Sequence, residues 1–216
     1  MSISENIKHI TNQLPTSVTL IAVSKTKPND MLLEAYNAGQ RDFGENYVQE
    51  LVNKYEQLPK DVNWHFIGHL QSNKVKYITP FVHLIHGVDS FSLLKEINKY
   101  AQKNKRVIDC LLQIYIAQEE TKFGFDFKEA SQILNSNEFK DLKNISIKGF
   151  MAMASNTNNT EQIKKEFASL KTFSLNYPDF KILSFGMSSD YKLAIQEGST
   201  MIRLGSSIFG ERNYNK

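Results

Sequence analysis

The chain has 216 residues, of which 41% are hydrophobic and 23% charged, so it has an ordinary globular composition and can bury a substantial core. A formal net charge of +3, without a run of lysines and arginines, gives no support for a nucleic-acid-binding protein. The single cysteine, Cys110, excludes a disulfide within the chain and fits a reducing compartment. No segment approaches the length of a membrane span and the N-terminus lacks the apolar core of a signal peptide, so we expect a cytoplasmic protein.

Short apolar runs alternate with amphipathic stretches along the chain, which predicts alternating strands and helices. The best punctuated helix has Asn29 as its expected N-cap and Gly39 as its left-handed C-terminal stop. In chain order we expect a helix over Glu5–Leu14, a strand over Val18–Ser24, a helix over Asp30–Ala38, a strand over Asp42–Glu45, a helix over Tyr47–Leu58, strands over Trp64–Gly68 and Leu84–Val88, a helix over Leu93–Asn104, a strand over Val107–Ile116, a helix over Lys128–Leu134, a strand over Ile145–Met153, a helix over Glu161–Leu175, a strand over Lys181–Met187, a helix over Tyr191–Gln196 and a strand over Met201–Leu204.

Strands that are nearly all followed by helices predict parallel pairing through right-handed crossovers. Eight such units of about 25 residues close a (β/α)₈ TIM-type barrel within this length, with the first helix as an N-terminal addition. An open doubly wound sheet is the structural alternative. No repeat or linker divides the chain, so we expect one domain over residues 1–216, with loops at Gln118–Lys122 and Asn156–Thr160.

Lys25 follows the apolar run 18–23, which is typical of a strand buried on both faces, so its amine should emerge where the strand leaves the core. A second cation at Lys27, together with partial burial, would lower the cost of holding that amine uncharged, as Schiff-base chemistry requires. The alternative is a lysine that snorkels from the end of a strand.

Two segments near the C-terminus have the composition of a phosphate site. Ser188 and Ser189 follow a strand and precede a helix expected near Asp190, whose first N–H groups suit a phosphate. Gly205 and Ser206 follow the last strand and could present amides to the other side of the same group. In a barrel, the loops after the seventh and eighth strands are the usual phosphate site. The serines could instead be ordinary helix caps.

Arg203 lies within an apolar strand, where a charge is expensive unless it has a partner. It could face a ligand, or it could pair with a helix carboxylate in a purely structural role. Metal ligation by His65 and His69 is disfavoured because the two residues leave a strand, and His86 has no obvious carboxylate partner in sequence. We expect Met151 and Met153 to fill the barrel.

Five ordered motifs, spread over nearly the whole chain, resemble the pyridoxal phosphate homeostasis protein family. They are Ala22-Val23-Ser24-Lys25-Thr26-Lys27-Pro28, Phe43-Gly44-Glu45-Asn46-Tyr47, His65-Phe66-Ile67-Gly68-His69-Leu70-Gln71-Ser72-Asn73-Lys74, Gly186-Met187-Ser188-Ser189-Asp190 and Arg203-Leu204-Gly205. The resemblance implies the fold of the alanine racemase N-terminal barrel, with pyridoxal 5′-phosphate (PLP) held as an internal aldimine on Lys25. It also implies that Ser188 and the backbone of Gly205 and Ser206 hold the phosphate, and that Arg203 faces the pyridine nitrogen.

The same resemblance leaves two classes of function. A racemase needs an acid/base on each face of the substrate α-carbon, and the alanine racemase resemblance places one of these, a tyrosine, on an additional β domain. Eight strand–helix units account for the whole of this sequence and leave no residues for such a β domain. We therefore expect no enzyme but a protein that takes part in intracellular PLP homeostasis without amino-acid turnover. PLP-dependent apo-enzymes would be its partners, and neither nucleic acid nor membrane is expected. A PLP-dependent, racemase-like enzyme is the alternative. A Schiff-base aldolase would not need this phosphate set.

Overall fold

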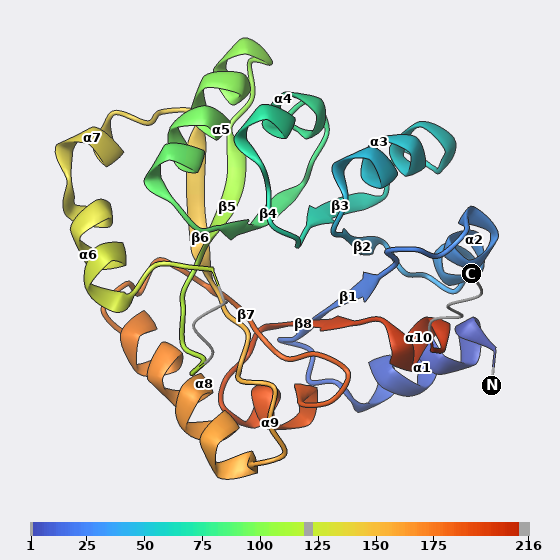
Figure 1. The fold of residues 1–216 in the computed structure, drawn as a ribbon. Coiled ribbons are helices and arrows are strands. Elements are labelled where there is room, and N and C mark those ends of the chain that lie inside the picture. The colour runs from blue at the N-terminus through green and yellow to red at the C-terminus, as the bar shows by residue number, and fades with distance from the viewer. Residues whose placement is uncertain (1, 119–122, 212–216) are drawn as a thin grey trace.

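The structure is a computed structural model that describes residues 2–118 and 123–211, so most of the loop expected at Gln118–Lys122 lies outside the described residues. Eight parallel strands close a barrel in the order of the chain, each paired with its neighbours in sequence and β1 with β8 (Figure 1). The TIM-type (β/α)₈ prediction is confirmed, and the open sheet is excluded. The strands are β1 Thr19–Val23, β2 Asp42–Glu45, β3 Asn63–Phe66, β4 Leu84–Val88, β5 Ile108–Gln113, β6 Ile145–Met151, β7 Ile182–Ser184 and β8 Met201–Leu204.

Helices surround this barrel, and α1 precedes it as expected. The helix α1 lies against α2 and α10, and Asn6 Nδ2 donates to Ile208 O at 2.9 Å, which ties the N-terminal helix to the end of the barrel. The described helices are α1 Ile3–Gln13, α2 Asn29–Asn37, α3 Val48–Gln57, the 3₁₀ helix η1 Ser72–Lys74, α4 Val75–Ile78, α5 Phe91–Lys103, α6 Phe127–Asn135, α7 Asn137–Lys140, α8 Thr160–Ser174, α9 Tyr191–Gln196 and α10 Ser206–Phe209.

The cap expected for α2 is wrong. Pro28 is its N-cap residue and makes no side-chain cap bond, while Asn29 is already helical. The Asn29 amide donates instead to Gln57 Oε1 on α3 at 2.7 Å, so this side chain joins two helices. Gly39 has a φ of +101° and ends the helix as predicted.

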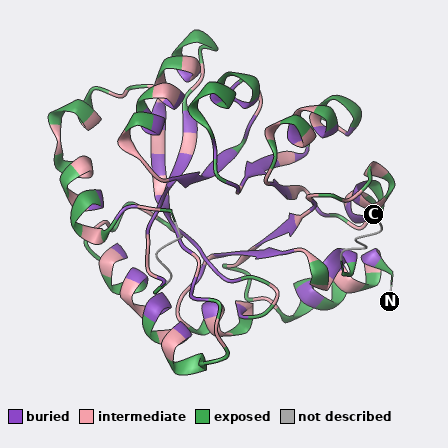
Figure 2. Cartoon of the chain, in the orientation of Figure 1, coloured by how far each residue is buried: buried purple, intermediate pink, exposed green. Residues whose placement is uncertain are grey.

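Two layers of side chains fill the molecule. The larger apolar core lies between the strands and the helices, whose outer faces are exposed (Figure 2). A smaller apolar cluster within the barrel consists of Ile21, Leu84, Leu111, Met151 and Met201. Buried polar residues from β3, β4, β7 and β8 lie in the same interior, namely His65, His86, Ser184 and Arg203. The barrel is therefore a packed core whose polar part lies beside the site described next.

No helix in the described part of the chain is both long and apolar enough to cross a membrane.

Candidate functional site

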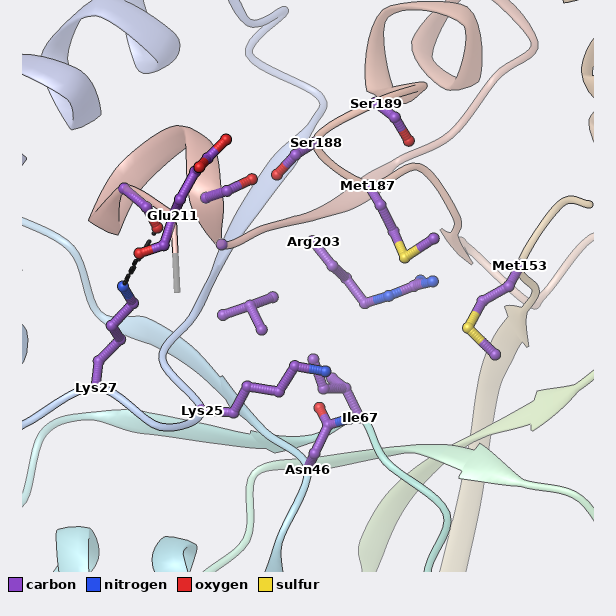
Figure 3. A pocket seen from close by; sticks show the side chains of 14 residues that line it. Lys25, Lys27, Asn46, Ile67, Met153, Met187, Ser188, Ser189, Arg203 and Glu211 are labelled. Atoms are coloured by element: carbon purple, nitrogen blue, oxygen red, sulfur yellow. Dashed lines mark hydrogen bonds between the residues drawn. The ribbon is translucent and has the colours of Figure 1, made fainter. Parts of the chain in front are cut away.

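A cavity of about 680 Å³ opens among the segments that follow the carboxyl ends of the strands, where barrels of this type carry their sites. All five residues singled out from the sequence line it: Lys25, Ser188, Arg203, Gly205 and Ser206. Figure 3 shows the Lys25 amine and the Arg203 guanidinium within the same cavity, with Ser188 and Ser189 at another side. Residues from both ends of the sequence thus meet in one place, as the sequence predicts.

Lys25 is the second residue of the loop after β1, and this loop is under local strain. Thr26 has a φ of +65°, a left-handed conformation that costs a residue with a β-branched side chain about 1–3 kcal/mol. Glu50 on α3 accepts the Thr26 N–H at 2.6 Å, which holds the strained residue in place. The backbone immediately after Lys25 is therefore fixed from a neighbouring helix.

The backbone immediately before Lys25 is held by a buried ion pair. Lys54 Nζ donates to Ser24 O at 2.8 Å, to Glu45 Oε1 at 2.7 Å and to Glu50 Oε1 at 2.7 Å. The Ser24 hydroxyl also donates to Glu45 Oε1, at 2.6 Å. Burial raises the pKa of Glu45 to about 7, against the lowering effect of Lys54 and Ser24. We call Glu45, Glu50 and Lys54 the Lys25 clamp.

Lys27 has a different role from that expected. Its amine donates to the carbonyl oxygens of Phe209, Gly210 and Glu211 at 3.1–3.2 Å, and the bond to Glu211 is drawn in Figure 3. The side chain thus ties the rim of the cavity to the segment after α10. Carbonyl oxygens at the end of a helix attract a cation.

Two turns, after β7 and after β8, bring Ser188 and Ser189 and Gly205 and Ser206 to the cavity. After β7, Gly186 has a φ of +99°, and a Cβ there would lie 2.5 Å from Ala194 Cβ, so only glycine fits this turn. Asp190 Oδ1 accepts the Met187 N–H at 2.6 Å and fixes the loop that carries Ser188. After β8, a Cβ on Gly205 would lie 3.3 Å from Val23 O, so this glycine allows β8 and β1 to approach closely.

Arg203 is 5% exposed and reaches the cavity from β8. Its Nη1 donates to Ser184 O and to Ser184 Oγ, both at 2.7 Å, and its Nη2 donates to Ala152 O at 3.1 Å. Burial lowers the pKa of Arg203 to about 10, partly opposed by the charge of Asp190, so the guanidinium is charged at neutral pH. A cation that can only donate is therefore held at the wall of the cavity.

Several residues that line the cavity were not identified from the sequence, most notably Asn46 and Met153. Asn46 follows β2, and its buried Oδ1 has no hydrogen-bond partner within the described residues, which marks it as an acceptor for a ligand. Its sequence signals are its place directly after a buried strand and within the motif Phe43-Gly44-Glu45-Asn46-Tyr47. Met153 lines the cavity, although we expected it to fill the barrel, whereas Met151 lies in the interior cluster as expected. Val23, Ile67 and Met187 complete the apolar walls.

The histidines do not form a metal site. Within residues 2–118 and 123–211, no group of three or more His, Cys, Asp or Glu is arranged to hold a metal ion. His65 turns into the barrel, where its Nδ1 lies 2.9 Å from His86 Nε2, while the His69 Nδ1 lies 2.8 Å from Asp89 Oδ2. The two residues therefore have separate partners.

Comparisons with known proteins settle the family. The sequence model of the alanine racemase N-terminal domain matches residues 1–213. Curated proteins named pyridoxal phosphate homeostasis protein are 36% identical to this chain in Vibrio alginolyticus, over 99% of both chains, and 39% identical in Aquifex aeolicus, over 90% of this chain and 87% of that protein. The chain belongs to the pyridoxal phosphate homeostasis protein family.

Solved structures agree with membership of the pyridoxal phosphate homeostasis protein family. PipY of Synechococcus elongatus, solved without PLP, is 37% identical with a TM-score of 0.89, over 97% of this chain and 100% of that one. PipY with PLP bound is 36% identical with a TM-score of 0.86, over the same shares of the two chains. An alanine racemase of Clostridium difficile has a TM-score of 0.79 at 14% identity, with 58% of its chain covered, and shows the shared fold alone.

Proposed function

We propose that this chain binds PLP covalently through Lys25 and takes part in PLP homeostasis without turning over amino acids. The observation that carries the proposal is the convergence of one amine, one buried guanidinium and two amide-bearing turns on a single cavity. The family relatives named for PLP homeostasis and the PLP-bound PipY structure support it. The chain also spans nearly the full length of these relatives.

The residues present fit the polar groups of PLP. The Lys25 amine can condense with the aldehyde and release water. The hydroxyl of Ser188 and the N–H groups that begin α10, at Gly205 and Ser206, suit the phosphate. Apolar walls suit the faces of the ring, and the unpartnered Oδ1 of Asn46 offers an acceptor to a polar substituent of the ring.

Arg203 bears on the question of turnover. When bound to an enzyme, PLP supplies an electron sink, which is strongest when the pyridine nitrogen is protonated. If Arg203 faces this nitrogen, as the family resemblance implies, its guanidinium can only donate to it and would disfavour protonation of the nitrogen and weaken the sink. The arginine alone does not discriminate between a carrier and a racemase-like enzyme, since the alanine racemase resemblance includes it too.

The phosphate site makes a direct prediction. Ser188→Ala removes one charge-assisted hydrogen bond, so we expect PLP to be held less tightly by about 1.5–3 kcal/mol, roughly a 10- to 150-fold rise in Kd. Titration followed by absorbance measures the change, and Ser207→Ala, whose side chain does not line the cavity, is the matched control. Pyridoxal without its phosphate should bind much less tightly than PLP. Equal affinity for both ligands would contradict this assignment.

Delivery of the cofactor tests the homeostasis role. PLP-loaded protein mixed with a PLP-free apo-enzyme is expected to restore the activity of that enzyme. The matched control is the same loaded protein after borohydride reduction, which fixes the cofactor on Lys25 and should abolish delivery. If the unreduced protein restores no more activity than the reduced protein does, the proposed role is wrong.

A further inference from the structure

A line of hydrogen bonds crosses the barrel from Asp42 at the start of β2 to Arg203 at the cavity. Asp42 Oδ1 lies 3.0 Å from His65 Nε2, and His65 Nδ1 lies 2.9 Å from His86 Nε2. His86 Nδ1 lies 3.0 Å from Ser184 Oγ, which accepts from Arg203 Nη1 at 2.7 Å. His65, His86 and Ser184 are at most 1% exposed, so water does not compete for these bonds.

The donors along this line are fixed from its carboxylate end. The Asp42 carboxylate can only accept, so His65 carries its proton on Nε2 and donates to it. Because a neutral imidazole has a single N–H, His65 Nδ1 accepts from the Nε2–H of His86, and His86 Nδ1 in turn accepts from the Ser184 hydroxyl. Ser184 Oγ also accepts from Arg203, which can only donate. Every bond in the line then points the same way, from the cation at the cavity to the carboxylate at the other end.

The charges around the line agree with this arrangement. Burial lowers the pKa of both imidazoles, although Asp42 opposes the effect on His65, so both rings are neutral. Burial opposes the ionisation of Asp42, yet the hydrogen bonds from His65 and Asn63 outweigh it and lower the pKa of the carboxyl. His83 lies outside the line, with its ring centroid 5.2 Å from that of His65, and Asp190 acts on Arg203 from the α9 side.

We propose that Asp42, His65, His86 and Ser184 are positioning residues that fix the guanidinium of Arg203, with both imidazoles neutral and protonated on Nε2 alone. No single bond in this line can reverse its direction, because the reversal would leave two donors or two acceptors facing each other in a buried site. The line therefore restricts the position of the guanidinium. The expected effect of these residues on PLP bound beside Arg203 rests on the proposed function, whereas the protonation pattern of the histidines does not.

Long-range ¹H–¹⁵N correlation NMR of the histidines, on the ligand-free protein at neutral pH, tests the pattern. We expect His65 and His86 each to show a protonated Nε2 and an unprotonated Nδ1. Asp42→Ala removes the final acceptor, so the single tautomer should be lost at both rings. Asp42→Asn keeps an acceptor oxygen and should restore it, and His83→Gln should leave both rings unchanged.

A protonated Nδ1 on either ring of the unmutated protein would overturn the proposal, as would an Asp42→Ala variant in which His86 keeps its tautomer. In the PLP-loaded protein, Asp42→Ala should also shift the absorption maximum of the cofactor and hasten its release, while His83→Gln should do neither. A protein that bound no PLP would refute the proposed function yet leave the NMR result to decide this inference.

Discussion

Lys25→Ala is expected to abolish covalent retention of PLP and the yellow colour of the loaded protein. Lys25 is the lysine whose amine lies within the cavity beside Arg203, whereas the amine of Lys27 is engaged by three backbone carbonyls at the rim (Figure 3). Borohydride reduction followed by peptide mass mapping should place a pyridoxyl group on Lys25. Because Lys25 stands at the surface of a cavity, we expect the variant to fold and to keep its circular dichroism spectrum.

Lys27→Ala is the matched control. It removes the tie to the segment after α10 but leaves the Lys25 amine in place, so the colour and the adduct on Lys25 should remain. An adduct found on Lys27 in the unmutated protein would refute the assignment.

Lys54→Met is expected to lower the free energy of unfolding by about 3–5 kcal/mol, the usual cost of breaking a buried ion pair by removing one partner. The Lys54 side chain is 6% exposed and that of Glu45 is fully buried, so the carboxyl would lose its cationic partner in a site shielded from solvent. Chemical denaturation followed by fluorescence measures the change. The variant should also retain PLP less well, because Ser24 O, next to Lys25, loses its donor.

The destabilisation caused by Lys54→Met should depend on pH through the carboxyl of Glu45. The folded-state pKa of Glu45 is about 7, above the ordinary value of 4.5, so the folded protein binds more protons than the unfolded chain between these values. The contribution of this carboxyl to stability is present below pH 4.5 and is lost as the pH rises to about 7. Without Lys54 the pKa of Glu45 in the folded protein should rise further, so stability continues to fall as the pH rises above 7. The destabilisation by Lys54→Met should therefore be greater at about pH 8 than at about pH 6.

The double variant Lys54→Met/Glu45→Gln separates charge from packing. Glutamine keeps an oxygen for the Ser24 hydroxyl and carries no charge, so it should recover most of the stability that Lys54→Met loses. A single variant that unfolds as readily at pH 6 as at pH 8, with no recovery in the double variant, would show that the ion pair is not the cause.

The fold could be predicted from the sequence because each strand carries its own signal. The strands β2, β4 and β8 have the predicted bounds. Others end early for local reasons: the expected Lys181–Met187 stops at Ser184 because the chain turns at Gly186, and Val107–Ile116 stops at Gln113, where Phe125 begins to pair with the chain. The short helices α4, α7 and α10 were not predicted, because four residues are too few to show a periodicity.

Part of the site could be predicted because several of its residues directly follow predicted strands. Lys25, Ser188 and Gly205 follow strands, and a barrel brings all such positions to one end. The Lys25 clamp could not be found this way, because Lys54 is 30 residues from Ser24 and only the i, i+4 spacing of Glu50 and Lys54 hints at a pair. The line from Asp42 to Arg203 joins five strands, and its partners depend on the closed barrel rather than on any local pattern.

The most direct test of PLP handling without turnover is α-proton exchange. PLP-loaded protein is offered a panel of L-amino acids in deuterated water, and the α-proton signal of each is followed by NMR. Our account predicts no exchange at ordinary enzymatic rates. Exchange at such rates that is lost in Lys25→Ala would contradict it and would identify the protein as a racemase-like enzyme.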